Sequence, residues 1–449
     1  MADTQPYRPD PAILTLGDGF FDPVEAAGFP KHQVRFFNRR WAEQVGLGAV
    51  DVEAHFGRFE PLPGNLPKPL ALRYHGHQFR HYNPDIGDGR GFLFAQLRDE
   101  DGRLLDLGTK GSGQTPYSRF GDGRLTLKGG VREVLATEML EALGVNTSKS
   151  FALVETGEEL QRNDEPSPTR SAVLTRLGHG HVRIGTFQRL AFHEDAKGIA
   201  KLVSYSLRTL FDEESDDPAR LFDLVAARTA TLAASYLAAG FVHGVLNSDN
   251  INITGESFDY GPWRFAPTWD ESFVAAYFDH GGLYAFGRQP EAIHWDLAQL
   301  GGCLALVTEG PLLAAILDAW SARFEDSLVE ALVRRLGIAP EPERDRALVS
   351  AMLTALRRQD DTIDRFFFDW RGGRVPDGGD PALAKQLAGR SALAHALDHD
   401  YWQDADPCSM HIEEVEAIWA AIAERDDWGP FDLKIAAIRR MGAAHDVTP

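Results

Sequence analysis

The chain has 449 residues, enough for two or more hydrophobic cores, and its 43% apolar content is ordinary for a globular protein. A formal net charge of −20 disfavours nucleic acid or an anionic membrane as a partner, although a few local cations suffice to bind one nucleotide. The cysteines are only two, Cys303 and Cys408, and no signal pattern or apolar run of about 18 residues occurs, so we expect a cytoplasmic protein with neither disulfide scaffold nor membrane span.

The segment 1–70 is rich in proline and predicts an irregular N-terminal extension with one helix at 38–46. Residues 71–185 then predict a small lobe of strands around one helix. Within it, apolar segments at 91–97 and 104–109 flank a turn signal, which indicates a β-hairpin.

A helix is expected at 130–143, and Gly144 suits its C-terminal end. Two more strands are expected at 150–154 and 171–176, with a polar loop at 157–168 between them. Strands, one helix and two further strands follow each other in this order in the N-lobe of a protein kinase. Other α+β domains share the same order.

Residues 186–449 predict a mostly helical part, because apolar residues recur there at helical spacing. Strand-like pieces at 241–245 and 251–254 bracket a polar segment. Further helices are expected in three later segments, 312–336, 347–356 and 412–423.

The polar segment at 243–250 and the Asp-Tyr-Gly sequence at 259–261 are similar to the catalytic and metal-binding loops of a protein kinase. One part is missing, because Val245 occupies the position of the catalytic aspartate. Valine cannot accept a proton or orient a hydroxyl. The segment therefore predicts a site that holds a metal and a nucleotide without ordinary phosphoryl transfer.

Asn250 and Asp259 supply the oxygen ligands that Mg²⁺ or Mn²⁺ prefers when it bridges phosphates. Asp249 is the carboxylate beside them, and it is a candidate general base for an incoming hydroxyl. The alternative interpretation is that this aspartate only caps a turn.

Gly87 and Gly89 precede a strand and would let backbone N–H groups approach phosphates, although a tight turn also explains them. Lys110 ends the next strand and would pair with a glutamate of the following helix. That helix carries three glutamates that spacing alone does not separate: Glu133, the natural candidate, Glu138 and Glu141. Arg176 and Arg183 would give bidentate phosphate contacts, unless they are surface ion pairs.

Taken together, these motifs resemble the selenoprotein O family of protein adenylyltransferases. The resemblance covers roughly residues 20–300, and the strings that carry it are GHQF at 76–79, GDGR at 87–90 and 121–124, KG at 110–111, GQTPYSR at 113–119, RE at 132–133, HVR at 181–183, HGV at 243–245, NSDN at 247–250, FDYGP at 258–262, QP at 289–290 and HW at 294–295. It implies a protein-kinase-like two-lobed fold, here with the N-terminal extension and a divergent helical C-terminal region. It also implies transfer of AMP from ATP, bound flipped relative to kinases, to Ser, Thr or Tyr hydroxyls of proteins.

The same resemblance implies roles for individual residues. Gly87, Gly89 and Arg90 would line the nucleotide, and Asp249 would be the base. The phosphates would be surrounded by five residues, with Glu133 pairing the lysine: Lys110, Asp122, Gly123, Arg176 and Arg183. Asn250 and Asp259 would hold Mg²⁺ or Mn²⁺, so that Asp259 also faces the nucleotide.

Two departures and two rival functions accompany this interpretation. Many members of the family carry a redox-active Cys or selenocysteine next to the C-terminus, whereas this chain ends Asp446-Val447-Thr448-Pro449. An Asn-Pro stretch expected in the C-terminal third is also absent. The rival functions are an ATP-dependent kinase, which the loss of the aspartate at Val245 disfavours, and an inactive nucleotide-binding scaffold, which would not need this set of charged residues.

Overall fold

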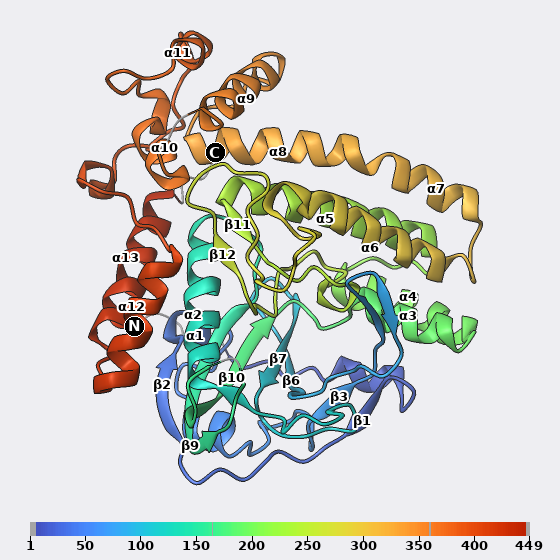
Figure 1. Cartoon of the computed structure of the whole chain (residues 1–449). Helices are drawn as coiled ribbons and strands as arrows, with labels where there is room; N and C mark the ends of the chain where they lie inside the picture. The colour runs from blue at the N-terminus through green and yellow to red at the C-terminus, as the bar shows by residue number, and fades with distance from the viewer. Residues whose placement is uncertain (1–5, 164, 359–360, 446–449) are drawn as a thin grey trace.

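An eight-stranded antiparallel sheet forms one side of the molecule, and a layer of helices forms the other (Figure 1). The computed structural model describes residues 6–163, 165–358 and 361–445. The strand order is β1-β3-β6-β7-β10-β9-β2, with β8 paired to β10. The strands are β1 (Phe21–Pro23), β2 (Gln33–Phe37), β3 (Leu70–Leu72), β6 (Leu93–Arg98), β7 (Leu104–Lys110), β8 (Leu125–Thr126), β9 (Lys149–Leu160) and β10 (Thr169–Gly178). This mixture of helix and sheet confirms the expected α+β class.

The first predicted elements are confirmed closely. The β6–β7 hairpin pairs Leu97 with Leu105, and the turn between its strands lies where it was expected. Helix α1 (Arg39–Gln44) and helix α2 (Leu127–Ala142) match the two predicted helices. Gly144 follows α2 with a φ of +79°, a left-handed conformation that glycine adopts at low cost.

Three predictions for segments before residue 255 are wrong. The loop expected at 157–168 is shorter, because β9 continues to Leu160 and pairs there with Thr169 of β10. The N-terminal extension is less irregular than its prolines indicate, since β1 and β2 both join the large sheet. The strand expected at 251–254 does not form, and β11 (Phe241–Val242) pairs instead with β12 (Arg264–Phe265). The division of the chain at residues 70 and 185 stays a prediction.

The helical layer is centred on α5 (Pro218–Ala239), which packs against α6 (Gln289–Leu304) and α8 (Trp320–Leu336). The helical segment expected at 312–336 contains two helices, α7 (Gly310–Asp318) and α8, with Ala319 between them. The remaining helices are α3 (Ile184–Phe192), α4 (Ala196–Leu210), α9 (Pro342–Leu356), α10 (Ile363–Asp369), α11 (Pro381–Leu387), α12 (Ile412–Arg425) and α13 (Gly429–His445). Of these, α9 and α12 confirm the last two predicted helices.

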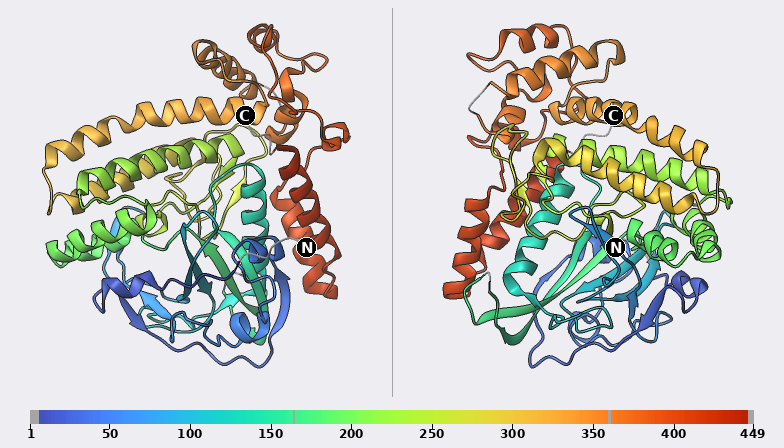
Figure 2. Two further views of the ribbon diagram at one scale, coloured as in Figure 1. Left: turned by 180° about the vertical axis from the view of Figure 1, so that it is seen from behind. Right: turned by 45° about the vertical axis from the view of Figure 1, so that its right-hand side comes forward.

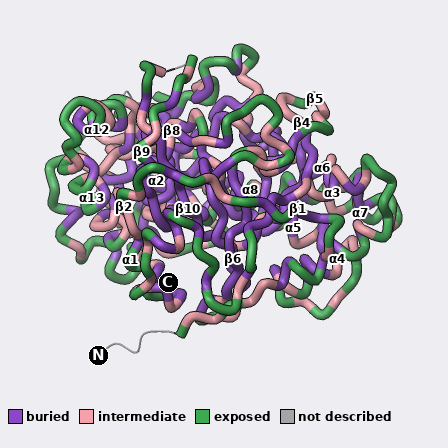
Figure 3. Tube along the Cα trace, turned by 90° about the horizontal axis from the view of Figure 1, so that it is seen from below, coloured by how far each residue is buried: buried purple, intermediate pink, exposed green. Residues whose placement is uncertain are grey.

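The C-terminal helices return to the sheet side of the molecule. Helices α12 and α13 both pack against α2, and Figure 2 shows this pair running beside it. Figure 3 shows the resulting core, with buried chain through α2 and β10 and exposed chain at the outer helices. Residues 446–449, which include the end where the family often carries a redox residue, lie outside the described residues. Among the described residues no helix is long and apolar enough to cross a membrane.

Candidate active site

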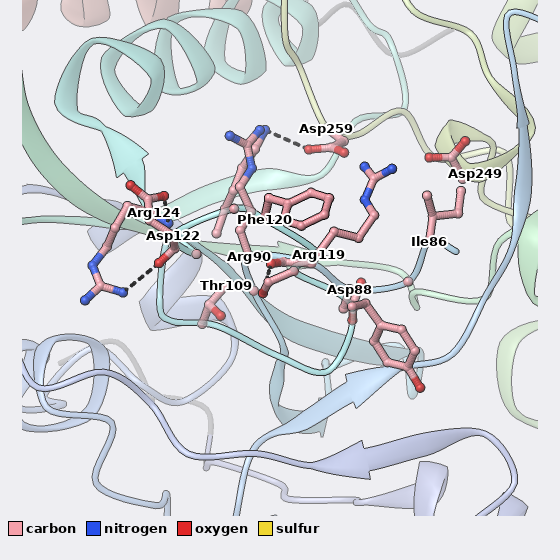
Figure 4. A pocket seen from close by; sticks show the side chains of 18 of the residues that line it. Ile86, Asp88, Arg90, Thr109, Arg119, Phe120, Asp122, Arg124, Asp249 and Asp259 are labelled. Atoms are coloured by element: carbon pink, nitrogen blue, oxygen red, sulfur yellow. Dashed lines mark hydrogen bonds and ion pairs between the residues drawn. The ribbon is translucent and has the colours of Figure 1, made fainter. Parts of the chain in front are cut away.

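A cleft of about 740 Å³ opens between the sheet and the loops that follow α5. Its lining brings together nearly all the predicted site residues: Gly87, Gly89, Arg90, Lys110, Asp122, Gly123, Arg176, Arg183, Asp249 and Asp259. Figure 4 shows Arg90, Arg119 and Phe120 in the middle of this cleft, between Asp122 at one end and Asp249 at the other. Two predicted residues do not line it directly. Glu133 lies behind Lys110, and Asn250 is the neighbour of Asp249.

The cleft is cationic although the protein is strongly anionic. Seven lysine and arginine side chains line it, against four aspartates, in a chain whose net charge is −20. A concave surface with this excess of positive charge attracts an anionic ligand and raises its local concentration. The composition alone did not reveal this, because the cations come from segments scattered between residues 90 and 183.

Lys110 and Arg176 share two carboxylates at the floor of the cleft. The Lys110 Nζ atom lies 2.6 Å from Glu133 and 2.7 Å from Asp259, and Arg176 Nη1 lies 3.2 Å and 3.3 Å from the same two groups. Burial opposes the charge on Asp259, but Lys110 and Arg176 outweigh it and hold the pKa of that carboxyl well below its usual range. Asp259 is therefore ionised, as a metal ligand must be.

The structure also separates the three glutamates of α2. Glu138 points away from the cleft and makes two 2.7 Å hydrogen bonds with Arg439 of α13. Glu141 pairs with Arg40 and accepts a hydrogen bond from the Trp41 indole. Only Glu133 of the three turns toward Lys110.

Asp249 lies at the other end of the cleft and is 8% exposed. Its Oδ1 atom is buried and has no hydrogen-bond partner among the described residues. Burial raises the pKa of its carboxyl to about 6, although the nearby Arg183 acts in the opposite direction. A carboxylate with a raised pKa and an unpartnered oxygen is well suited to accept a proton near neutral pH.

A small hairpin fixes the loop that carries Asp249. Strands β4 (Gly76–Gln78) and β5 (His81–Asn83) form it, and its backbone contacts the two residues before the aspartate. The His77 N–H donates to Ser248 Oγ at 2.7 Å, and the Phe79 N–H donates to Asn247 Oδ1 at 3.0 Å. The Tyr284 hydroxyl donates to the same Asn247 oxygen at 2.7 Å. These bonds pin the loop from two sides.

Arg183 connects Asp249 with the glycine loop. Its Nη1 donates to the Asp249 carbonyl at 3.0 Å, and its Nη2 lies 3.3 Å from Asp88. Asp88 is half-buried, and desolvation raises the pKa of its carboxyl although Arg183 acts in the opposite direction. The sequence places Asp88 inside a family motif without indicating a role for it. Asp88 also accepts a hydrogen bond from the Leu72 N–H at 3.0 Å, so it connects Arg183 to the backbone of β3.

The glycine loop is supported by the segment that follows β7. A Cβ on Gly87 would lie 2.5 Å from the Tyr117 ring, so the aromatic ring packs where only glycine fits. Thr115 and Ser118 donate hydrogen bonds to the carbonyls of Asp88 and Gly89. The sequence predicted no structural role for Thr115, Tyr117 or Ser118. The only sequence feature that could have indicated one is the Thr-Pro-Tyr-Ser string in which they occur.

Asp122 and Gly123 occupy the end of the cleft farthest from Asp249. Asp122 pairs with Arg162 at 2.8 Å. Gly123 has a φ of +70°, and a Cβ there would lie 2.3 Å from the Gly113 backbone. A larger residue at this position would push two chain segments apart, so the glycine maintains the shape of the cleft.

The residues expected to hold a divalent cation fit that task chemically. The Asn250 amide nitrogen donates to the Val245 carbonyl at 3.0 Å, so its side-chain oxygen is the atom a cation would contact. Asp259 contributes an ionised carboxylate. Within the described ranges no group of three or more His, Cys, Asp or Glu side chains could hold a metal. Two oxygen ligands completed by phosphate oxygens are typical of Mg²⁺ at nucleotide sites.

Comparisons with known proteins agree with this geometry. The profile of the family described as protein adenylyltransferase SelO matches residues 5–380. A relative from Synechococcus elongatus named protein nucleotidyltransferase YdiU is 47% identical, over 98% of this chain and 96% of its own length. The protein of the same name from Synechocystis sp. is 43% identical, over 94% of this chain and 96% of its own.

These matches confirm the resemblance inferred from the motifs and the nucleotidyltransferase class that it implies. They also extend it, since the motifs end at residue 295 and the family profile continues to residue 380. The chain therefore belongs to the SelO family of protein adenylyltransferases.

Proposed function

We propose that this protein transfers AMP from ATP to a Ser, Thr or Tyr hydroxyl of acceptor proteins and releases pyrophosphate. The observation that carries the proposal is the pairing, in one cleft, of seven cationic side chains with a buried carboxylate whose Oδ1 has no partner among the described residues. The cations can bind the negatively charged phosphates of ATP. The carboxylate can accept the proton that the acceptor hydroxyl loses.

The proposed reaction is an in-line displacement at the α-phosphorus. Asp249 accepts the proton of the acceptor hydroxyl, whose oxygen forms the new bond to phosphorus. The bond between the α-phosphorus and the oxygen bridging to the β-phosphorus breaks, and pyrophosphate takes the electron pair. Lys110, Arg176 and Arg183 neutralise the charge that develops on the leaving group. In this scheme ATP binds in the flipped orientation that the family resemblance implies, with its α-phosphate beside Asp249.

Asn250 and Asp259 would hold Mg²⁺ or Mn²⁺ in this scheme. Such a cation, when bound, withdraws charge from the phosphate oxygens and makes the phosphorus a better electrophile. The chain itself keeps Asp259 ionised through Lys110 and Arg176, and it engages the Asn250 amide nitrogen with the Val245 carbonyl, which leaves the amide oxygen as the atom for a cation. We further propose that the sheet side and the helical side correspond to the two lobes of a protein-kinase-like fold.

One experiment separates this function from the two alternatives. The protein is incubated with Mg²⁺ or Mn²⁺, a mixture of candidate acceptor proteins, and ATP labelled at either the α or the γ phosphate. Label entering protein from α-labelled ATP alone is the expected result. Label from γ-labelled ATP alone would identify a kinase. ATP binding with no transferred label would identify a scaffold.

A further inference from the structure

The arginine at position 119 is a cation of the cleft that neither the motifs nor the family assignment gave a role. Seven cationic side chains line the cleft, and five of them pair with carboxylates: Lys110, Arg124, Arg162, Arg176 and Arg183. Arg90 and Arg119 make no side-chain hydrogen bond or ion pair with any residue that the structure describes. These two guanidinium groups are therefore the ones whose N–H donors are not already engaged by a carboxylate of the described residues.

Arg119 has an unusual backbone conformation within a tight turn. The Gly121 N–H donates to the Ser118 carbonyl at 2.7 Å, which closes a tight turn with Arg119 as its first central residue. Arg119 has a φ of +53°, and turns with a positive φ at this position favour glycine. Arginine at this position therefore costs more conformational free energy than glycine would. Strained backbone conformations of this kind occur often at functional sites.

Hydrogen bonds on both sides of the turn fix the backbone of Arg119 at the cleft. Ser118 donates to the Gly89 carbonyl of the glycine loop, and the Gln114 amide donates to the Gly121 carbonyl at 2.8 Å. The turn is thus tied to the same loop that would line the nucleotide. Figure 4 shows Arg119 beside Arg90 in the middle of the cleft, between the two ends marked by Asp122 and Asp249.

We propose that Arg119 binds the phosphate chain of the nucleotide, acting with Arg90 as the pair of cations available for it. An unpaired guanidinium makes bidentate, charge-assisted hydrogen bonds with phosphate oxygens. Binding would require no existing ion pair of Arg119 to be broken. The proposal deepens the proposed function, because it rests on the nucleotide occupying this cleft.

The test is a binding titration of ATP and of inorganic tripolyphosphate, both at the same Mg²⁺ concentration, on wild type and three variants. Arg119→Gly removes the guanidinium and suits the turn better than arginine, so folding is not at risk. Arg119→Lys keeps the positive charge but lacks the planar guanidinium group that makes bidentate contacts. Arg358→Ala removes one exposed arginine that does not line the cleft, and it controls for net charge.

Arg119→Gly is expected to weaken the binding of both ligands about tenfold, which corresponds to about 1.4 kcal/mol. Arg119→Lys should recover part of the loss, and Arg358→Ala should bind as wild type does. Unchanged binding by Arg119→Gly overturns the proposal. A loss for ATP with none for tripolyphosphate also overturns it, because Arg119 would then contact the nucleoside.

The same titration, combined with the labelled-ATP transfer assay described above, distinguishes this proposal from the proposed function. Wild type that binds both ligands but transfers no AMP would contradict the transfer reaction and leave the role of Arg119 intact. Wild type that binds neither ligand would overturn both.

Discussion

The ammonium nitrogen of Lys110 lies 2.7 Å from a carboxylate oxygen of Asp259. One of these groups is expected at the phosphates and the other at the metal, so their contact joins the two halves of the proposed site. Glu133 and Arg176 complete the cluster, which then holds two cations and two anions. This balance allows four charged groups to lie at the floor of one cleft, since each offsets the desolvation of its neighbours.

The first prediction concerns Glu133, which is completely buried and serves both cations. Glu133→Gln leaves Lys110 and Arg176 with one carboxylate between them. We expect the free energy of unfolding to fall by about 3 kcal/mol, the typical loss when one partner of a buried ion pair is removed. Urea denaturation measures this directly.

Glu416→Gln is the matched control for that experiment. Glu416 pairs with Lys128 at 2.7 Å but is 46% exposed, so its loss should cost less than about 1 kcal/mol. Equal urea midpoints for wild type and Glu133→Gln would show that the buried cluster does not stabilise the fold.

The second prediction concerns Asp249 and pH. Burial raises the pKa of its carboxyl from 3.8 to about 6, so between these values the folded protein binds a proton that the unfolded chain releases. Stability therefore falls as the pH rises through this window, and Asp249→Asn removes the loss. We expect the variant to gain about 2–3 kcal/mol relative to wild type between pH 4 and pH 7.5.

Urea denaturation at the two pH values in EDTA tests this prediction without bound cations. The exposed Asp101→Asn serves as control and should change stability by less than about 0.5 kcal/mol at either pH. If Asp249→Asn tracks wild type at both pH values, burial does not disfavour the charge on Asp249.

The third prediction concerns Gly76, which lies directly against the proposed base. A Cβ at this position would lie 3.0 Å from both Cβ and Oδ1 of Asp249. Gly76→Ala should displace the carboxylate, and a shift of this kind is expected to slow AMP transfer about 10- to 100-fold while ATP binding stays within about twofold. Single-turnover transfer and ATP titration separate the two quantities.

Gly281→Ala is the control for Gly76→Ala. Nothing lies within 4 Å of a Cβ added to Gly281, and its backbone conformation is open to alanine. It should transfer AMP at the wild-type rate. Should Gly76→Ala do the same, the position of the Asp249 carboxylate is not critical to the reaction.

Local sequence signals predicted much of the sheet side and most of the cleft. The β6–β7 hairpin and α2 follow from short-range patterns, and so do the lysine at a strand end and the glycines before a strand. The motif residues also lie together, because they are carried on loops that meet at one cleft. The sequence narrowed the partner of Lys110 to three glutamates. Glu138 is excluded as the partner of Lys110 because it is hydrogen-bonded to Arg439, which lies 301 residues away in the sequence. A contact between such distant segments cannot be predicted from local sequence.

The wrong strand at 251–254 and the features that were not predicted have a common physical origin in contacts that local sequence does not encode. Strands β11 and β12 are too short to carry a periodic signal, so the pairing of Val242 with Arg264 depends on the fold around them. The support of the Asp249 loop by the β4–β5 hairpin joins residues 171 positions apart. The conformation of Arg119 depends on a turn whose residues carry no glycine at the required position.

The central claim is that Asp249 is the base of an AMP transfer and not a nucleotide-binding group. Its most direct test measures, on wild type and Asp249→Ala, the affinity for ATP and the transfer of label from α-labelled ATP to protein. We predict that Asp249→Ala binds ATP within about twofold of wild type and loses at least about 100-fold of the transfer rate, a typical contribution of a general base. Transfer by Asp249→Ala at the wild-type rate would contradict the account.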